Sequence, residues 1–237
     1  MSVAFLKVHA GFLALTFLIP ACSDRADRPV PAMERASVAN ASADSSAKKL
    51  WLIAPSGDTA DINANTSPAD LVRRFGEANL RAAEINIGEG VTMRGDVLFP
   101  DDSIRRVEIV WIDVKSRARP ARLQLSGSRS LWAIAPGISL GTSLTEIERY
   151  NGGPVTLTGF GWDFGGVITN FRGGRLVHLK GRTPNVFLQL HPSVHADDRA
   201  QQLRASVQGD HEFGSEIAAM QSLNPRVHLI IISYEAR

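Results

Sequence analysis

Two segments of the chain carry both a start signal and a stop signal for a short helix. In the first, Ser67 suits the N-cap, Pro68 suits the first helical turn, and Gly76 follows as a stop. In the second, Ser143 and Glu146 have the spacing of a capping box, and an Asn-Gly-Gly-Pro run ends the segment. Both segments are therefore predicted to be short amphipathic helices.

Strand-like runs follow each of these two helices. After the first helix, residues 105–114 are β-branched and apolar on both faces, residues 121–125 alternate, and residues 130–135 complete the set. After the second helix, residues 167–180 have the pattern of a hairpin that turns at two adjacent glycines, and residues 185–190 supply another strand. The order of elements therefore predicts an α+β fold with antiparallel strands.

The repeated order predicts two tandem units, each made of one short helix followed by an antiparallel β-meander. The units cover about residues 62–135 and 138–192, and a helix near 197–207 and a last strand at 227–234 complete the domain. This arrangement resembles that of the β-lactamase-inhibitor-protein class and of small envelope lipoproteins with related units. The resemblance covers element order over roughly residues 62–190, and it implies a binding surface without catalytic residues.

The N-terminus has the pattern of an export signal. Lys7 is the only charge before an apolar run at residues 10–19, which is too short to span a bilayer, so residues 1–21 are predicted to be a signal peptide. The run ends in Ile19-Pro20-Ala21-Cys22, which resembles the bacterial lipobox, with proline in place of the usual small residue. Cys22 is the only cysteine of the chain, so it cannot form an internal disulfide. Lipidation of Cys22, with palmitate among the acyl chains, is the leading interpretation, and a buried or chance cysteine after an ordinary signal peptide is the alternative.

The residues after Cys22 indicate where the protein is held. Ser23, in place of aspartate, resembles the outer-membrane class of lipoproteins, which predicts an anchor in the outer membrane and a domain that faces the periplasm. Residues 22–49 are rich in Ala, Ser, Pro and Asp and lack apolar periodicity, so they are predicted to be a disordered tether. Residues 50–237 are predicted to form one domain. The formal net charge of +2 and the export signal both argue against a nucleic-acid partner.

The stretch GFGWDFGG, residues 159–166, places aromatic residues at every second position. A strand would put Phe160, Trp162 and Phe164 on one face as core, and Gly161 and Asp163 on the other. In one interpretation the glycines let another part of the domain pack closely, and the aspartate caps a turn or pairs with an arginine. In the other, an open trough beside the tryptophan takes a polar ligand such as a sugar or a peptide amide.

Catalysis is the weaker of the two functional interpretations. Glu89 also lies between glycines, so it could pair with Asp163 as the two acids of a sugar hydrolase. No serine-nucleophile motif is present, and Cys22 is taken by lipid. His191 and His195 have a spacing that suits one helix face, but the pattern lacks a third ligand, so no metal is expected.

These patterns predict a lipid-anchored binding or assembly module of the envelope that has no catalytic role, no cofactor and no metal. Its partner would be another envelope protein or a cell-wall polymer. The candidate binding residues are Trp162, Asp163, Gly161 and Glu89. The alternative is an envelope hydrolase or carbohydrate-processing protein that uses acids near residues 159–166.

The lipid anchor gives a direct test. The Cys22→Ser variant should no longer be labelled by a radioactive fatty acid in cells, because the thiol that carries the acyl chain is gone. Labelling is measured on the immunoprecipitated chain beside the wild type. Equal labelling of the two proteins would contradict the lipoprotein interpretation.

Overall fold

A computed structural model of the 237-residue chain describes residues 51–53, 61–113, 115–180, 184–192 and 198–234. The predicted signal peptide, Cys22, the tether and His195 lie outside the described residues. Within the described part, no helix has both the length and the apolar character needed to cross a membrane.

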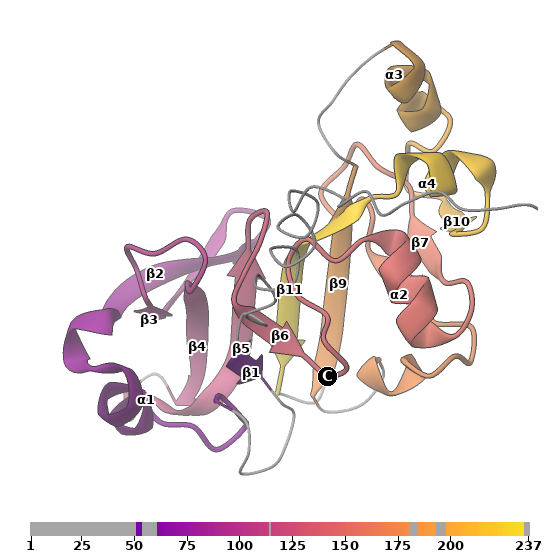
Figure 1. Cartoon of the computed structure of the whole chain (residues 1–237). Coiled ribbons are helices and arrows are strands. Elements are labelled where there is room, and N and C mark those ends of the chain that lie inside the picture. Colours follow the sequence, from indigo (N-terminus) through magenta and orange to yellow (C-terminus); the bar gives the residue numbers. More distant parts are fainter. Residues whose placement is uncertain (1–50, 54–60, 114, 181–183, 193–197, 235–237) are drawn as a thin grey trace, which may run out of the picture. The chain divides into compact units, whose positions relative to one another are not determined.

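A six-stranded antiparallel sheet forms the framework of the domain (Figure 1). The chain visits four of its strands in succession after the first helix, whereas the other two strands come from the C-terminal half. Across the sheet the strands are β2 (Leu80–Gly88), β3 (Val91–Leu98), β4 (Val107–Asp113), β5 (Ala118–Ser126), β11 (Arg226–Ser233) and β9 (Asn185–His191). The predicted strands at 105–114, 121–125, 185–190 and 227–234 are confirmed by β4, β5, β9 and β11.

Shorter elements pack around this sheet and complete an α+β fold, as predicted. The smaller sheets are β10 (Glu212–Gly214), β7 (Thr156–Thr158) and β8 (Ile168–Asn170), and the parallel pair β1 (Trp51–Ile53) and β6 (Trp132–Ile134). The α-helices described are α1 (Pro68–Phe75), α2 (Leu144–Asn151), α3 (Asp198–Ala205) and α4 (Ala218–Leu223). Single 3-10 turns lie at Glu77–Asn79 and Val177–Leu179.

The strand expectations for residues 130–135 and 167–180 are wrong in detail. Residues 130–135 were expected to complete the first meander, but β6 pairs in parallel with β1 instead. Residues 167–180 were expected to form a hairpin, but only β8 is a strand, and its partner is β7. The second arm becomes a 3-10 turn because Leu176 and Leu179 are buried there, and the Leu176 amide donates to the side chain of Asn151.

Both predicted helices begin at a capping box. The Ser67 hydroxyl accepts a hydrogen bond from the Asp70 amide, and Ser143 does the same for Glu146. Each acidic side chain accepts in return from the backbone amide of its serine. Hydrogen bonds from the Ser67 hydroxyl and then the Ser67 amide lower the pKa of Asp70, and those from the Ser143 amide and then the Ser143 hydroxyl lower the pKa of Glu146. The local signals that predicted the two helices are therefore the interactions that hold their first turns.

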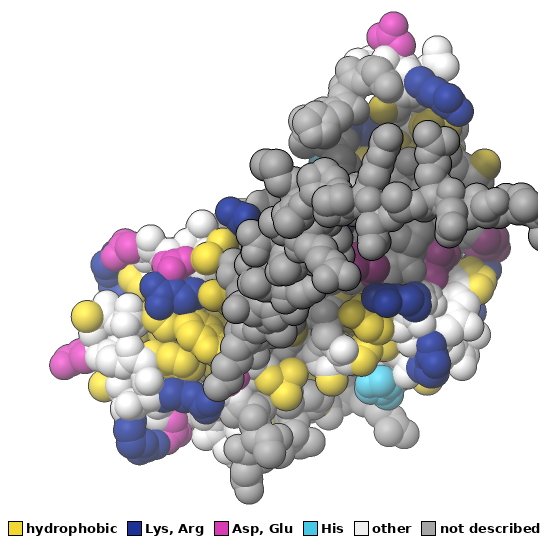
Figure 2. All heavy atoms as spheres, viewed as in Figure 1, with side chains coloured by type: hydrophobic (Ala, Val, Ile, Leu, Met, Phe, Trp, Pro, Cys, Tyr) yellow, Lys and Arg dark blue, Asp and Glu magenta, His cyan; other side chains and the backbone are white. Residues whose placement is uncertain are grey.

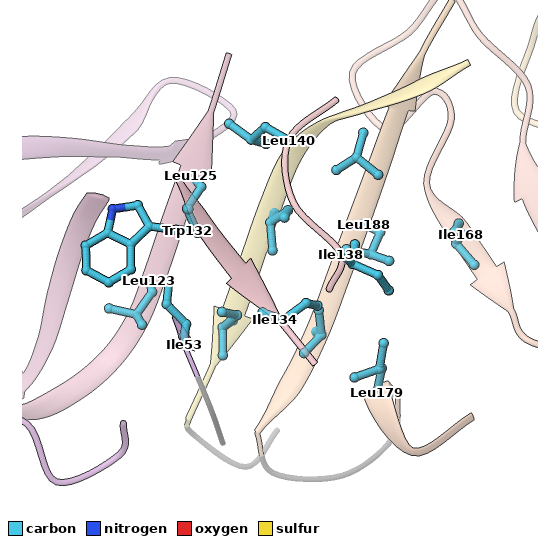
Figure 3. Packing of buried hydrophobic residues seen from close by; sticks show 14 of the residues in the cluster. Ile53, Leu123, Leu125, Trp132, Ile134, Ile138, Leu140, Ile168, Leu179 and Leu188 are labelled. Carbon is cyan, nitrogen blue, oxygen red and sulfur yellow. The ribbon is translucent and has the colours of Figure 1, made fainter. Parts of the chain in front are cut away.

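The two faces of the large sheet have different roles. On one face, alternate residues of β5 and β9 are fully buried, and their side chains lie beside those of β1 and β6 (Figure 3). Trp111 and Trp132 are the largest side chains in this core. In β5 and β9, the residues that alternate with these buried ones point to the other face of the sheet, and those in the middle of each strand are only half-buried.

Charged side chains of both signs are interspersed over the described surface shown in Figure 2, with apolar side chains between them. That distribution agrees with the small net charge of the sequence. The described part of this face therefore carries no extended field of one sign.

The β2–β3 hairpin approaches its neighbour closely at Gly95. This residue pairs with Ala83 on one side and with Val110 on the other, and a Cβ atom there would collide with the carbonyl oxygen of Ile109. Only glycine lets the backbones of β3 and β4 come this close.

Replacing Gly95 with alanine should lower the free energy of unfolding by about 1–3 kcal/mol or more, because backbone would have to move. Gly153→Ala is the matched control, since a Cβ at Gly153 meets nothing within 4 Å, and it should change stability by less than about 0.5 kcal/mol. Denaturant unfolding measures both. Equal stability of the two variants would show that β3 and β4 can separate freely at this point.

Candidate functional site

A groove with a volume of about 860 Å³ lies on the face of the large sheet that does not form the main core. Its floor is built by β5, β11 and β9, which lie side by side (Figure 1). A groove of this size is within the range that holds a small molecule or a short peptide segment. In the structure it lies between the tip of the β2–β3 hairpin and the turn at residues 159–166.

The strand register arranges the floor in three rows across the sheet. Each row takes one residue from β5 and its partner on β11, and two rows continue onto β9. The rows are Arg122 with Ser233, Gln124 with Ile231 and Phe187, and Ser126 with Leu229 and Gln189. The floor is thus polar and cationic at one end and largely apolar over β11 and β9.

The hairpin wall consists of residues 86–89 at the end of β2 and the start of the turn. The Gln124 amide nitrogen on the floor lies 3.4 Å from the Asn86 carbonyl oxygen and donates to it. Glu89 has a φ of 51° between two glycines that also have positive φ, so the chain reverses sharply there. This reversal leaves Glu89 exposed on the groove wall, where the sequence placed a candidate site residue.

The opposite wall is the segment 159–166, and it is a turn rather than the predicted strand. Gly165 donates to the carbonyl of Trp162, and the Thr158 hydroxyl donates to the carbonyl of Phe164, so the segment closes on itself. Gly161 and Gly166 have φ values of 91° and 77°, which other residues rarely adopt. The strand prediction is therefore wrong, because these conformations interrupt an extended chain.

The turn does have the close packing that its glycines suggested. A Cβ on Gly159 would lie 2.7 Å from the carbonyl oxygen of Gly209, and one on Gly166 would collide with the carbonyl oxygen of Leu190. From the floor, the Gln189 side chain donates to the carbonyls of Asp163 and Gly165, both at 2.9 Å. The wall is consequently fixed to β9 by side-chain and backbone contacts.

The aromatic residues of the turn do not all belong to the core. Phe160 is buried, as expected, but 39% of Trp162 and 50% of Phe164 are exposed. Their rings contact each other edge to face, with centroids 5.5 Å apart, and the Trp162 indole donates to the Gly159 carbonyl. The predicted core position of Trp162 and Phe164 is therefore wrong, since a turn has no face that alternates with period two.

The groove brings together part of the predicted site. Asp163 and Glu89 both line it, from opposite walls, whereas Gly161 and Trp162 do not. Trp162 lies next to the groove through its contact with Phe164, which does line it. Gly161 has a conformational role in the turn.

Sequence reasoning missed the groove floor. Arg122 and Gln124 occupy the polar positions of an alternating strand, which is also the pattern of an ordinary solvated face. Leu229 and Ile231 lie in a continuous apolar run, which gave no indication that two of its residues leave the core. The alternation in β5 was the one signal that could have identified the polar part of the floor.

A chain of polar contacts crosses the floor. Arg122 donates to the side-chain amide oxygen of Gln124 at 2.7 Å, and the Gln124 side-chain nitrogen donates to Glu108 at 3.1 Å. Arg106 donates to the other Glu108 oxygen at 2.9 Å. Glu108 is therefore neutralised by Arg106, and Gln124 separates it from Arg122.

Arg122 has unused hydrogen-bonding capacity. Its Nε atom is buried and has no hydrogen-bond partner among the residues the structure describes, and no described carboxylate lies within ion-pair distance. Burial lowers the pKa of the Arg122 guanidinium, and the charge of Glu108 opposes that shift. The guanidinium is charged at neutral pH in any case, so it is a desolvated cation at the polar end of the groove.

The histidines do not form a metal site in the described part of the chain. No group of three or more His, Cys, Asp or Glu side chains is placed there to hold a metal ion. His191 instead stacks edge to face on His228, with ring centroids 5.5 Å apart. Burial, and then the neighbouring His191 ring, lower the pKa of His228.

Comparison with known proteins finds no matching family model, no matching curated protein and no matching solved structure. The groove is therefore the feature that bears on function.

The attachment of the turn to β9 can be tested by hydrogen exchange. In Gln189→Leu, two carbonyls lose their donor while side-chain volume is nearly kept, so exchange of residues 159–167 should become faster. Gln124→Leu is the comparison variant, and it should instead speed exchange at residues 86–91. Unchanged exchange of the turn in Gln189→Leu would mean that other contacts hold this wall.

Proposed function

We propose that this protein is a lipid-anchored binding or assembly module of the bacterial envelope and that the groove is its binding site. The acyl chains on Cys22 would hold it at the outer membrane, and the tether would let the domain reach partners in the periplasm. The observation that carries the proposal is a sheet face with half-buried apolar residues between two fixed walls.

The groove floor supports binding because it differs from an ordinary solvated sheet face. Such faces are mainly polar, but here Phe187, Leu229 and Ile231 line an open cavity. Two exposed aromatic rings, Trp162 and Phe164, stand at one wall. Aromatic residues of this kind supply much of the binding energy at protein interfaces.

The charges of the groove bear on the class of partner. Among the described residues that line it, the carboxylates are those of Glu89, Glu108 and Asp163, and the arginine is Arg122. A phosphate backbone would meet repulsion from these groups, which supports an envelope protein or a cell-wall polymer as partner and disfavours nucleic acid.

The tandem-unit architecture stays part of this proposal. α1 and α2 each begin with a capping box. α1 would begin the first unit, at about 62–135, and α2 the second, at about 138–192. In support, strands β2 to β5 follow α1 as a meander. Against a simple repeat, the strands after α2 are divided between two sheets.

An envelope hydrolase is the second candidate, and one observation favours it. Glu89 and Asp163, the two acids that sequence reasoning paired, line the same groove. Both are exposed, however, and they stand on opposite walls. Glu89→Gln and Asp163→Asn separate the candidates. Both variants keep an oxygen that can accept a hydrogen bond from a partner, so a binding module would still capture it, whereas a hydrolase would lose turnover of wall fragments with either change.

The binding proposal is tested by blocking the groove. Ser126 is exposed on the floor, so Ser126→Trp should fill the cavity without disturbing the core, and Ser128→Trp, just outside it, is the matched control. A photo-crosslinking amino acid at position 164 should form an adduct in cells, and Ser126→Trp should abolish it while Ser128→Trp preserves it.

A second crosslinking position controls for exposure alone. Val177 is as exposed as Phe164 and does not line the groove, so the same amino acid there should give no such adduct. An adduct at position 164 that survives Ser126→Trp would place binding outside the groove.

A further inference from the structure

We infer that the groove binds an extended peptide segment whose acidic side chain pairs with Arg122 and whose apolar side chain two residues away packs over Ile231. This inference rests on the proposed function, because it names the ligand of the same groove. It makes Arg122 the residue that determines specificity.

The unsatisfied guanidinium is the first argument. Arg122 uses one nitrogen for Gln124, while its Nε atom is buried and unpaired within the described part of the protein. A ligand cannot reach that shielded atom itself, but the rest of the guanidinium lines the groove and keeps further N–H donors for a ligand acceptor. Carboxylate oxygens match the arginine fork and form two parallel hydrogen bonds with it.

The other charges of the groove select the kind of anion. Glu108 is already paired with Arg106, but no cation among the described residues forms an ion pair with Glu89 or Asp163 on the two walls. A doubly charged group such as a phosphate would be repelled more strongly than a carboxylate with a single charge. The groove therefore favours a single carboxylate over a phosphate.

The floor geometry selects a peptide. Arg122 and Ile231 are diagonal neighbours on adjacent strands, since Gln124 pairs with Ile231 and Arg122 pairs with Ser233. Such diagonal positions lie about 7–8 Å apart. In an extended peptide, side chains two residues apart share a face and are separated by about 7 Å. A ligand of the form apolar-x-acidic thus places both groups over their counterparts at once.

The walls suit the same ligand. Phe187 and Leu229 extend the apolar surface beyond Ile231, and Phe164 forms the adjoining wall. The exposed carboxylates on the walls can accept hydrogen bonds from peptide N–H groups.

Synthetic peptides test the inference against the full chain purified in detergent. The probe Ac-Ala-Leu-Ala-Glu-Ala-NH2, labelled with a fluorophore, should bind at least tenfold more tightly than the same peptide with Gln in place of Glu. A third peptide, Ac-Ala-Ala-Leu-Glu-Ala-NH2, puts the two groups on opposite faces and should bind as weakly as the Gln peptide. Fluorescence anisotropy measures each affinity.

The arginine is tested in the same assay. Arg122→Gln should remove the preference for Glu over Gln, and Arg122→Lys should keep part of it because the charge stays while the fork is lost. Arg81→Gln is the matched control, since Arg81 is exposed and pairs with Asp101 away from the groove. If Arg122→Gln does not fold, the Nε–H resonance of Arg122 in the wild type should shift on adding the Glu peptide and not the Gln peptide.

The outcomes separate this inference from the proposed function. Equal binding of the Glu and Gln peptides, or a preference that survives Arg122→Gln, would overturn the role of Arg122. The proposed function would still stand if the crosslink at position 164 remains sensitive to Ser126→Trp. A crosslink at position 164 that no longer depends on residue 126 would contradict both the role of Arg122 and the proposed function of the groove.

Discussion

The last strand that the structure describes, β11, forms backbone hydrogen bonds to β5 along one edge and to β9 along the other. It therefore joins a meander built early in the sequence to a strand that follows the second helix. Neither half has a complete sheet without it, because β9 has no other strand partner among the described elements. The groove floor depends on the same pairing, since its three rows run across β5, β11 and β9.

The walls depend on the floor in turn. Each wall is a chain reversal that contributes little core, and each is connected to the sheet by a glutamine side chain, Gln124 or Gln189. The side-chain amide of glutamine can donate to a backbone carbonyl, so it holds a turn in place. Because the amide is uncharged, the charges of the groove remain those of its carboxylates and Arg122. A preformed groove loses little conformational entropy when a ligand binds.

Sequence reasoning succeeded where the determining interactions are local. Ser67 and Ser143 cap helices through residues three positions away, so their patterns identified α1 and α2. The turn at 159–166 was misread because its conformation depends on Gly209 and Leu190, which are distant in sequence. Glu89 and Asp163 were chosen for their glycine neighbours, and they line one groove, but nothing in the sequence indicates that the floor between them contains Arg122.

The orientation of β11 shows why the apolar run could not reveal the floor. Val227 is buried in the core, and so are Ile230 and Ile232, although strict alternation would put Val227 on the other face from them. A bulge between Val227 and Leu229 inserts one extra residue and changes which face each later residue occupies. Without it, the alternation that keeps Val227 in the core would also keep Leu229 and Ile231 there, and the apolar floor would not form.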